Sequence, residues 1–392
     1  MIDWRRPFGR RHARVRDGDA SALSRRDLEE KQSAVGPMLA LSHLGRPVWT
    51  PRDYLSLARE GFAQNPIVYR CVRLIAEAAA SVPLSVWEGG ERQDDHPLVA
   101  RLDRPNPEQS RQELFEQLFG FLQTAGNAYL EAAGDGLEEF YALRPDRMRV
   151  VPGASGWPAA YDYTVGTRSR RLMRATDGFS PVLHLKLFNP SDDWYGAAPL
   201  EAAARAVDVH NAASAWNKAL LDNQARPSGA LIYGGGHLSE AQFATLKGEL
   251  DGAYSGPGNA GRPMVLEGGL DWKPMALSPH DLDHVEGKHA AAREIALAFG
   301  VPPQMLGIPG DNTYQTFKEA QAAFWRQTVV PLVGKTAGAM TAWLKPRFPD
   351  VEITPDLEGV PALAAEREAL WARLEAAGFL TLEERRRMAG VG

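Results

Sequence analysis

Residues 199–224, with the sequence PLEAAARAVDVHNAASAWNKALLDNQ, predict a long helix that decides how the chain is organised. Its apolar positions recur with helical spacing and form one stripe of mostly small side chains, so a second helix can approach closely. The stripe comprises Ala202, Ala206, Val209, Ala213, Trp216 and Leu220. A second helix is expected over 281–299, about 28 Å long at 1.5 Å per residue. We therefore expect two paired helices that carry whatever lies between them in the sequence.

The insert between these helices, residues 225–279, is expected to form a small α/β module. Its pattern predicts strand, helix, strand and strand, and Ser239 with Gln242 forms the capping box of the helix. After the second helix comes a proline-rich turn, and then a long helical segment over 314–345. Pro331 should kink that segment, because proline lacks the amide hydrogen and its ring clashes with the preceding turn. The layout predicts a projecting module on a helical stalk.

The chain before residue 199 predicts an α+β region. Asn65 and Pro66 begin a helix as its cap and first residue, and Ser110 with Glu113 forms the capping box of another. Short β-rich segments alternate with turns, as is typical of α+β folds. These segments lie at 127–133, 138–143, 147–151, 160–165 and 182–187. A strand at 351–354 and two helices, at 361–377 and 382–389, are expected after residue 350, and Thr381 with Glu384 should form the capping box of the last helix.

Length and composition exclude several classes of protein. A chain of 392 residues exceeds one ordinary core, so we expect two or more domains. The net charge of −5 argues against a protein whose main task is to grip nucleic acid, although nucleic acid could pass through it. The single cysteine, Cys71, excludes an intrachain disulfide, and its place on an apolar helix face predicts a core residue. No run of eighteen apolar residues occurs, so we expect no membrane-spanning helix.

The N-terminal 49 residues are predicted to be an Arg-rich arm. Residues 1–16 carry six arginines and one aspartate. Two interpretations are open: a disordered tail, or an arm that docks on a neighbouring subunit or an acidic partner. Arg5-Arg6 resembles a twin-arginine export signal, but more charge follows instead of an apolar segment, so we expect no export.

Three motifs resemble chemical sites but occur in the wrong context. The G-x-G-x-x-G pattern at 256–261 follows a helix and precedes a strand, which reverses the order of a dinucleotide site. Gly334-Lys335-Thr336 resembles the end of a phosphate loop but lies inside a predicted helix. His280 and His284 are four residues apart and could hold a metal with a third ligand, although a solvated helix start explains them more simply. We expect no enzyme, cofactor or metal site, and a metal-dependent enzyme using His280 and His284 is the remote alternative.

Ten short motifs occur in a fixed order over more than 200 residues. They are Asn65-Pro66-Ile67-Val68-Tyr69, His96-Pro97-Leu98, Pro105-Asn106-Pro107, Gly126-Asn127-Ala128-Tyr129-Leu130, Leu143-Arg144-Pro145, Val182-Leu183-His184-Leu185, Tyr195-Gly196-Ala197-Ala198-Pro199-Leu200, Arg226-Pro227-Ser228-Gly229, Phe299-Gly300-Val301-Pro302-Pro303 and Thr313-Tyr314. Each motif alone is weak, but together and in this order they make the chain resemble the HK97-type portal proteins. Those proteins form the ring at one capsid vertex of tailed phages and phage-derived gene transfer agents.

The resemblance implies the portal fold, an α+β fold with a division into named parts. They are an Arg-rich arm at 1–49, an α+β wing at 50–198, stem helices at 199–224 and 280–300, a small α/β clip at 225–279, a tunnel loop at 301–313, a long kinked helix returning to the wing at 314–350, and a small helical crown segment at 351–392. These boundaries agree with the helical stalk and projecting module that the residue pattern predicts.

The resemblance also implies a non-catalytic function. The chain would form a homo-oligomeric ring, a dodecamer, which is the channel for DNA packaging and exit. The ring would contact the major capsid protein, dock the large terminase and later the head–tail adaptor, and let double-stranded DNA pass non-specifically. It would be part of a virion or virus-like particle assembled in the bacterial cytoplasm, without a membrane. A generic oligomeric capsid scaffold or adaptor without a DNA channel is the alternative.

A ring around moving DNA must surround a polyanion without holding it, because tight phosphate contacts would stall movement. We expect a weakly acidic stem wall formed by Asp281, Asp283, Glu286 and Lys288. The side chains expected nearest the DNA in the tunnel-loop region are Gln304, Met305, Asn312, Tyr314 and Gln315. Packing of Met305 and Tyr314 inside their own subunit is the alternative. The clip residues expected to contact terminase or adaptor are Arg226, His237, Asn259 and Arg262.

Overall fold

The structure is a computed structural model, and it describes most of the chain after residue 48. The described residues are 49–134, 137–154, 156–175, 177–222, 229–233, 239–242, 244–245, 248, 270–274, 284–310 and 314–389. The chain divides into two units, 1–48 and 49–392, and only the second is described below. The predicted N-terminal arm lies outside the described residues apart from Trp49. In the described part of the chain, no helix is long and apolar enough to cross a membrane.

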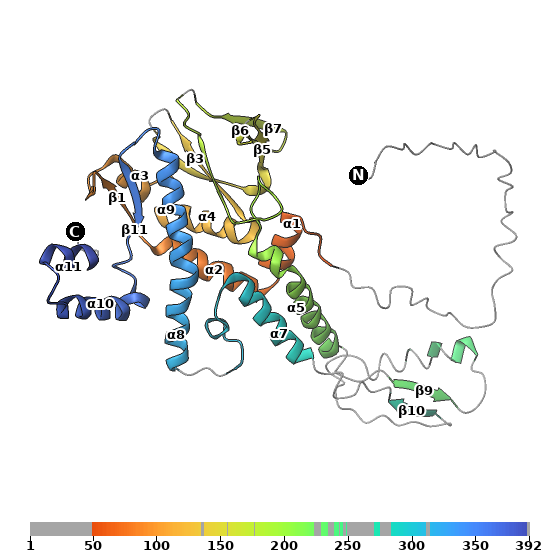
Figure 1. Ribbon diagram of the computed structural model, residues 1–392. Helices are drawn as coiled ribbons and strands as arrows, with labels where there is room; N and C mark the ends of the chain where they lie inside the picture. Colours follow the sequence, from red (N-terminus) through yellow and green to blue (C-terminus); the bar gives the residue numbers. More distant parts are fainter. Residues whose placement is uncertain are drawn as a thin grey trace, which may run out of the picture. The chain divides into compact units, whose positions relative to one another are not determined.

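Two helices near the start of the described chain form the centre of the hydrophobic core (Figure 1). Helix α2 (Pro66–Ser81) begins at the predicted cap Asn65, whose side-chain oxygen accepts hydrogen bonds from two helical amides. Helix α4 (Arg111–Ala125) begins at the predicted capping box and packs against α2. Cys71 is fully buried in α2, which confirms it as a core residue.

Eleven strands in the described residues form small antiparallel sheets. They are β1 (Leu84–Glu88), β2 (Glu91–Arg92), β3 (Asn127–Ala133), β4 (Glu139–Leu143), β5 (Met148–Pro152), β6 (Pro158–Val165), β7 (Arg168–Met173), β8 (Val182–Lys186), β9 (Gly229–Tyr233), β10 (Leu270–Pro274) and β11 (Val351–Pro355). The strand orders are β11-β1-β2, β4-β3-β8, β5-β6-β7 and β10-β9. The five strands predicted before residue 199 are confirmed, with ends shifted by up to two residues.

Strand β7 is not predicted by the sequence, because RSRRLM lacks the apolar alternation of a half-buried strand. Pairing with β6 and burial of Leu172 hold it in place. Strand β11 pairs with β1, so the segment after residue 350 adds a strand to the sheet that begins near residue 84. The indole of Trp87 donates to the Thr354 hydroxyl at 2.8 Å across this pair. The two strands lie side by side next to α9 in Figure 1.

The predicted pair of long helices is present as α5 (Pro199–Asp222) and α7 (His284–Phe299), which pack against each other. After the short turn η6 (Pro303–Leu306), α8 (Tyr314–Phe324) and α9 (Val330–Leu344) follow as one long helix (Figure 1). A π-helical turn, η7 (Trp325–Val329), joins them just before Pro331. The wider turn accommodates a proline that cannot donate a helical hydrogen bond.

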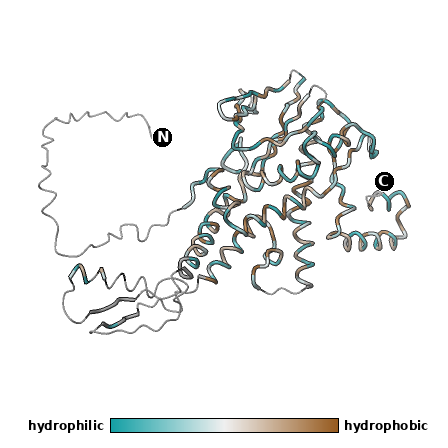
Figure 2. The backbone as a smooth tube through the Cα atoms, turned by 180° about the vertical axis from the view of Figure 1, so that it is seen from behind, coloured by the Kyte–Doolittle hydropathy of each residue, from teal (hydrophilic) through white to brown (hydrophobic). Residues whose placement is uncertain are grey.

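The remaining helices are short or lie near the end of the chain: α1 (Tyr54–Leu57), η2 (Ala58–Ala63), α3 (Pro97–Asp103), η3 (Pro145–Arg147), η8 (Pro361–Leu363), α10 (Ala364–Ala376) and α11 (Leu382–Ala389). The capping box predicted for α11 is present, because the Glu384 carboxylate accepts from the Thr381 amide at 2.8 Å. Figure 2 shows hydrophobic and hydrophilic residues alternating along these and the longer helices, as expected for helices with one buried side.

Candidate functional site

Helix α7 carries the described part of the predicted stem wall. Glu286 is exposed and Lys288 is half-buried. Arg293 and Glu294, about two turns beyond Glu286, are exposed. Leu297 is 80% exposed. The described part of α7 therefore balances two acids against two bases. It presents a surface of mixed sign instead of a strongly charged one.

A buried polar junction joins the middle of α5 to the start of α2. The Asn65 amide nitrogen lies 3.1 Å from His210 Nδ1 and donates to the Asn211 side-chain oxygen at 2.8 Å. Burial lowers the pKa of His210, and the charges of Lys288 and His289 lower it further. The imidazole is therefore neutral at neutral pH, and its Nδ1 can accept from Asn65. This junction orients the helix pair relative to the core.

The turn after α7 is tied to its surroundings at both ends. The Thr328 hydroxyl in the π turn donates to the Gly300 carbonyl at 2.6 Å, and Arg293 donates to the Pro309 carbonyl at 2.5 Å. Met305 is half-buried and packs against the hydrophobic core, while Gln304 beside it is also half-buried. Met305 therefore packs in part within its own subunit, and contact of Met305 and Gln304 with DNA stays a prediction.

Several predicted site residues lie outside the described residues. They are Asp281, Asp283 and His280 before α7, Asn312 before α8, and Arg226, His237, Asn259 and Arg262 in the predicted clip. Tyr314 and Gln315 begin α8 and His284 begins α7, but their side chains are not among those described. Across the described ranges, no group of three His, Cys, Asp or Glu side chains could hold a metal ion.

The motifs at 126–130, 182–185 and 195–200 meet in a buried polar network that the sequence did not predict. The Asn127 oxygen accepts from the Gly196 amide at 2.8 Å and from His184 Nε2 at 3.0 Å, and its nitrogen donates to the Gly196 carbonyl at 3.2 Å. The His184 ring stacks on Tyr129 with centroids 4.3 Å apart. Burial lowers the pKa of His184 to about 3, with a smaller effect from the Lys186 charge. A neutral imidazole that donates from Nε2 completes the network.

The same place brings two glycines into contact. Gly126 ends α4 with φ at +68°, and its carbonyl accepts from the Leu187 amide at 2.9 Å. A Cβ added at Gly196 would lie 2.2 Å from the Gly126 oxygen. Both glycines are therefore required by close backbone approach, and the motifs they belong to serve the architecture of the fold.

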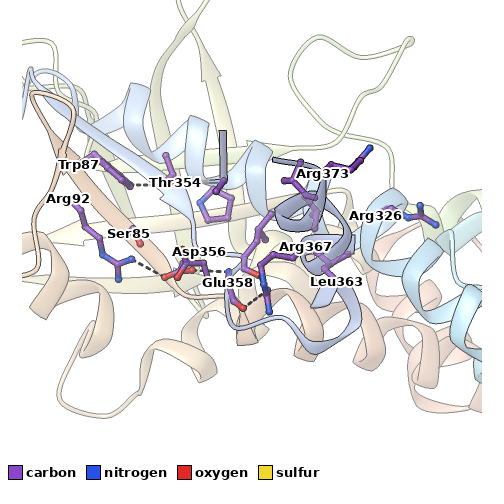
Figure 3. A pocket seen from close by; sticks show the side chains of 15 residues that line it. Ser85, Trp87, Arg92, Arg326, Thr354, Asp356, Glu358, Leu363, Arg367 and Arg373 are labelled. Carbon is purple, nitrogen blue, oxygen red and sulfur yellow. Dashed lines mark hydrogen bonds and ion pairs between the residues drawn. The ribbon is translucent and has the colours of Figure 1, made fainter. Parts of the chain in front are cut away.

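A hollow of about 600 Å³ opens between strands β1 and β11, the π turn and the terminal helices (Figure 3). Arg92 donates to Asp356 at 3.1 Å, and Arg367 donates to the Glu358 backbone oxygen at 2.5 Å (Figure 3). The lining residues include neither histidine nor cysteine, and the Asp356 carboxylate forms an ion pair with Arg92. Four arginines and two acids, Asp356 and Glu358, line the hollow, so its charged groups are mostly basic.

Proteins of related sequence identify the family. The family model described as phage portal protein matches residues 66–390. An uncharacterized protein of Rickettsia bellii is 41% identical over 346 residues, which cover 85% of this chain and 88% of that protein. The portal protein of Enterobacteria phage HK97 is 26% identical over 372 residues, which cover 91% of this chain and 83% of the phage protein.

Solved structures of gene transfer agent (GTA) particles agree with this result. A chain in the neck of an empty GTA particle, computed with C6 symmetry, is 54% identical with a TM-score of 0.71, covering 89% of this chain and 96% of that one. A chain in the neck of a native GTA particle, computed with C12 symmetry, is 52% identical with a TM-score of 0.69. This match covers 92% of this chain and 99% of that one. From the α+β fold, the paired helices and these similarities, we conclude that the chain belongs to the phage portal protein family, of the HK97 type.

Proposed function

We propose that this chain assembles into a closed ring, a dodecamer, that forms the DNA channel at one vertex of a phage or gene transfer agent capsid. The observation that carries the proposal is the similarity, at 52% identity over 92% of this chain, to a chain in a particle neck computed with C12 symmetry. Subunits in such a ring meet through heterologous contacts, which close on themselves only at a set number of copies.

In this proposal the parts of the chain have separate tasks. The α+β region 50–198 is the wing, α5 and α7 belong to the stem, and residues 225–279 form the clip. The turn 301–313 is the tunnel loop, and α8 with α9 is the long helix that returns to the wing. Residues 351–392 are the crown segment, although β11 at its start pairs with β1 of the wing.

The charge pattern of α7 supports passage of DNA without tight binding. The described wall carries the acids Glu286 and Glu294 as well as the bases Lys288 and Arg293, so it offers no continuous row of cations to the phosphates. Binding that depends on few phosphate contacts is weak, and screening over about 8 Å confines what remains to close approach. The ring would thus guide DNA while ATP hydrolysis in the terminase moves it, and the chain itself would catalyse no reaction.

Native mass spectrometry with negative-stain imaging tests the ring. Twelve copies of the 42.9-kDa chain should appear as a species of about 515 kDa with a central hole. A chain that stays monomeric or dimeric across a range of salt concentrations would contradict the proposal. A large assembly without a central hole would instead favour the scaffold or adaptor alternative.

A clip deletion tests the partner assignment. Replacement of residues 225–279 by a short Gly-Ser linker should leave the ring intact and abolish its co-sedimentation with the large terminase and the head–tail adaptor. Charge reversal at exposed Arg104, far from the clip in sequence, serves as the control and should leave docking unchanged. Terminase binding that survives the deletion in an intact ring would overturn the clip assignment.

A further inference from the structure

Strand β7 is a basic edge of its sheet. It pairs with β6 on one side, and no described strand pairs with its other side. Residues 147–174 carry six arginines and a single acid, Asp162, in a chain whose net charge is −5. Among the described residues, Arg170 is paired with Glu131 and Arg171 with Asp162, each at 2.7 Å. Arg168 and Arg174 are exposed and form no ion pair with a described residue.

Apolar surface accompanies this basic edge. Met173, Ala160 and Val151 lie in one row across the three strands, on the face of the sheet opposite the buried Leu172. Ala160 in this row is itself buried, so the exposed apolar surface of the row comes from Met173. The next row is Arg149, Asp162 and Arg171. Met173 is 65% exposed and Trp157, in the β5–β6 turn, is 73% exposed. Arginine, methionine and tryptophan are enriched where protein surfaces meet, so this combination favours a protein partner over a nucleic acid.

The β1–β2 hairpin is an acidic edge on a different sheet. Strand β2 ends the order β11-β1-β2 among the described strands. Residues 88–95 carry four acids and one arginine, Arg92, which is bound by Asp94 and Asp356. Glu88 and Glu91 lie directly opposite each other in the register. Like charges in that position destabilise a strand pair, and a basic neighbour would relieve the repulsion.

These two edges determine which contacts between copies are possible. Contact of β7 with β7, or of one hairpin with another, would bring like charges together and is disfavoured. Contact of β7 with the hairpin of a second copy would instead bring opposite charges together. A contact between two different surfaces of the same chain is heterologous, and heterologous contacts generate rings, whereas a self-complementary contact stops at a dimer.

We propose that the basic edge of each subunit, β7 with Arg168 and Arg174, docks against the acidic β1–β2 hairpin of the next subunit. The inference rests on the ring of the proposed function and names the surfaces that close it. Arg168 and Arg174 face Glu88 and Glu91 of the neighbouring copy. Met173, which lies on the opposite face of β7 from Arg168, adds apolar contact area at the same edge of the sheet. The charges also disfavour the like-with-like dimer that would compete with ring closure.

Reciprocal charge reversal tests this contact. The double variant Arg168→Glu, Arg174→Glu and the double variant Glu88→Arg, Glu91→Arg should each lower the fraction of subunits in rings at least tenfold, measured by native mass spectrometry. The combination of all four substitutions should restore that fraction to within twofold of the parent. Far-UV circular dichroism and thermal melting confirm that each variant is folded. Arg171 is left unchanged because its bond to Asp162 belongs to the fold.

A matched control carries the same charge change elsewhere. Arg59 and Arg104 are exposed and lie outside both edges, so Arg59→Glu with Arg104→Glu should leave ring formation unchanged. Unchanged rings in either test variant, or failure of the fourfold variant to recover, would overturn the proposal. The Arg168→Glu, Arg174→Glu variant could instead keep its rings but lose affinity for a duplex DNA fragment. The β7 edge would then bind a polyanion, and the proposal would likewise be overturned. A parent chain that forms no ring would instead count against the proposed function.

Discussion

Asn127 and Gly196 are joined by two hydrogen bonds between one side chain and one peptide segment. The Asn127 oxygen accepts from the Gly196 amide at 2.8 Å, and its nitrogen donates to the Gly196 carbonyl at 3.2 Å. The pair connects the end of α4 to the segment that leads into α5. The sheets of the α+β region before residue 199 and the helix pair α5–α7 are thereby connected through a buried contact.

Removal of this contact should destabilise the fold. Asn127→Ala leaves the Gly196 amide and the His184 ring nitrogen without their shared acceptor in a buried place. Unsatisfied buried groups each cost about 1–3 kcal/mol, so the free energy of unfolding should fall by at least that amount in urea titrations. Thr167→Ala in the exposed β6–β7 turn is the control and should stay within about 0.5 kcal/mol of the parent. Equal stability of both variants would contradict the role of the network.

Two glycine substitutions should separate steric conflict from backbone strain. Gly126 and Gly89 both have positive φ, at +68° and +61°. A Cβ at Gly126 would lie 2.5 Å from the Gly196 oxygen, whereas nothing lies within 4 Å of a Cβ at Gly89. Gly89→Ala should therefore cost about 1–2 kcal/mol, the price of a left-handed conformation. Gly126→Ala should cost clearly more, and comparable melting temperatures would argue against the close approach.

His184 should make the stability depend on pH. Its pKa is about 3 in the folded protein because of burial, against an ordinary value of 6.5. Between pH 3 and pH 6.5 the unfolded state binds the proton more readily than the folded state. The contribution of His184 to the free energy of unfolding is therefore complete above about pH 6.5 and is lost as the pH falls toward 3. The free energy of unfolding should decrease by up to about 1.4 kcal/mol per pH unit from this group. His184→Gln should reduce the measured slope between pH 6 and pH 4, and an unchanged slope would refute the assignment.

Cys71 should be unreactive until the protein unfolds. Burial raises the pKa of its thiol to about 12, so almost no thiolate exists at neutral pH and no reagent reaches it. A thiol-reactive dye should label the native chain orders of magnitude more slowly than the chain in denaturant. Because the chain has one cysteine, the labelling signal is unambiguous. Fast labelling of the native chain would show that α2 is not packed as described.

Met305 and Gln304 should behave differently when truncated. Met305 packs against the core but is only half-buried, so Met305→Ala should lower the free energy of unfolding by about 1 kcal/mol, less than the 2–5 kcal/mol for a fully buried methionine. Gln304→Ala should change stability less than Met305→Ala, because the Gln304 side chain is polar and only half-buried and therefore removes little apolar surface from water. A Met305→Ala variant with parental stability would favour a side chain directed to the channel.

Local structure was well predicted wherever it depends on neighbouring residues. The capping residues Asn65, Ser110 and Thr381 each begin the helix expected of them, because a cap bonds amides only two or three positions away. Pro331 likewise lies in the first turn of α9, where regular α-helical hydrogen bonding changes. The sequence does not predict that a π turn comes directly before it. The helix pair α5 and α7 follows from apolar stripes of helical period.

The residue pattern alone predicted most of the helices and strands, the buried cysteine, and the family through its ordered motifs. The tertiary fold sets which distant residues meet: β11 with β1, Asn127 with Gly196, and His184 with Tyr129. It also makes RSRRLM a strand. The polar pattern of this segment does not predict a strand, but pairing with β6 supplies the backbone hydrogen bonds that form one. The physical reason is the sequence distance over which each interaction acts. Helix caps and apolar periodicity involve residues a few positions apart. Strand pairing and buried polar networks join residues that are far apart in the sequence, so they depend on how the whole chain folds.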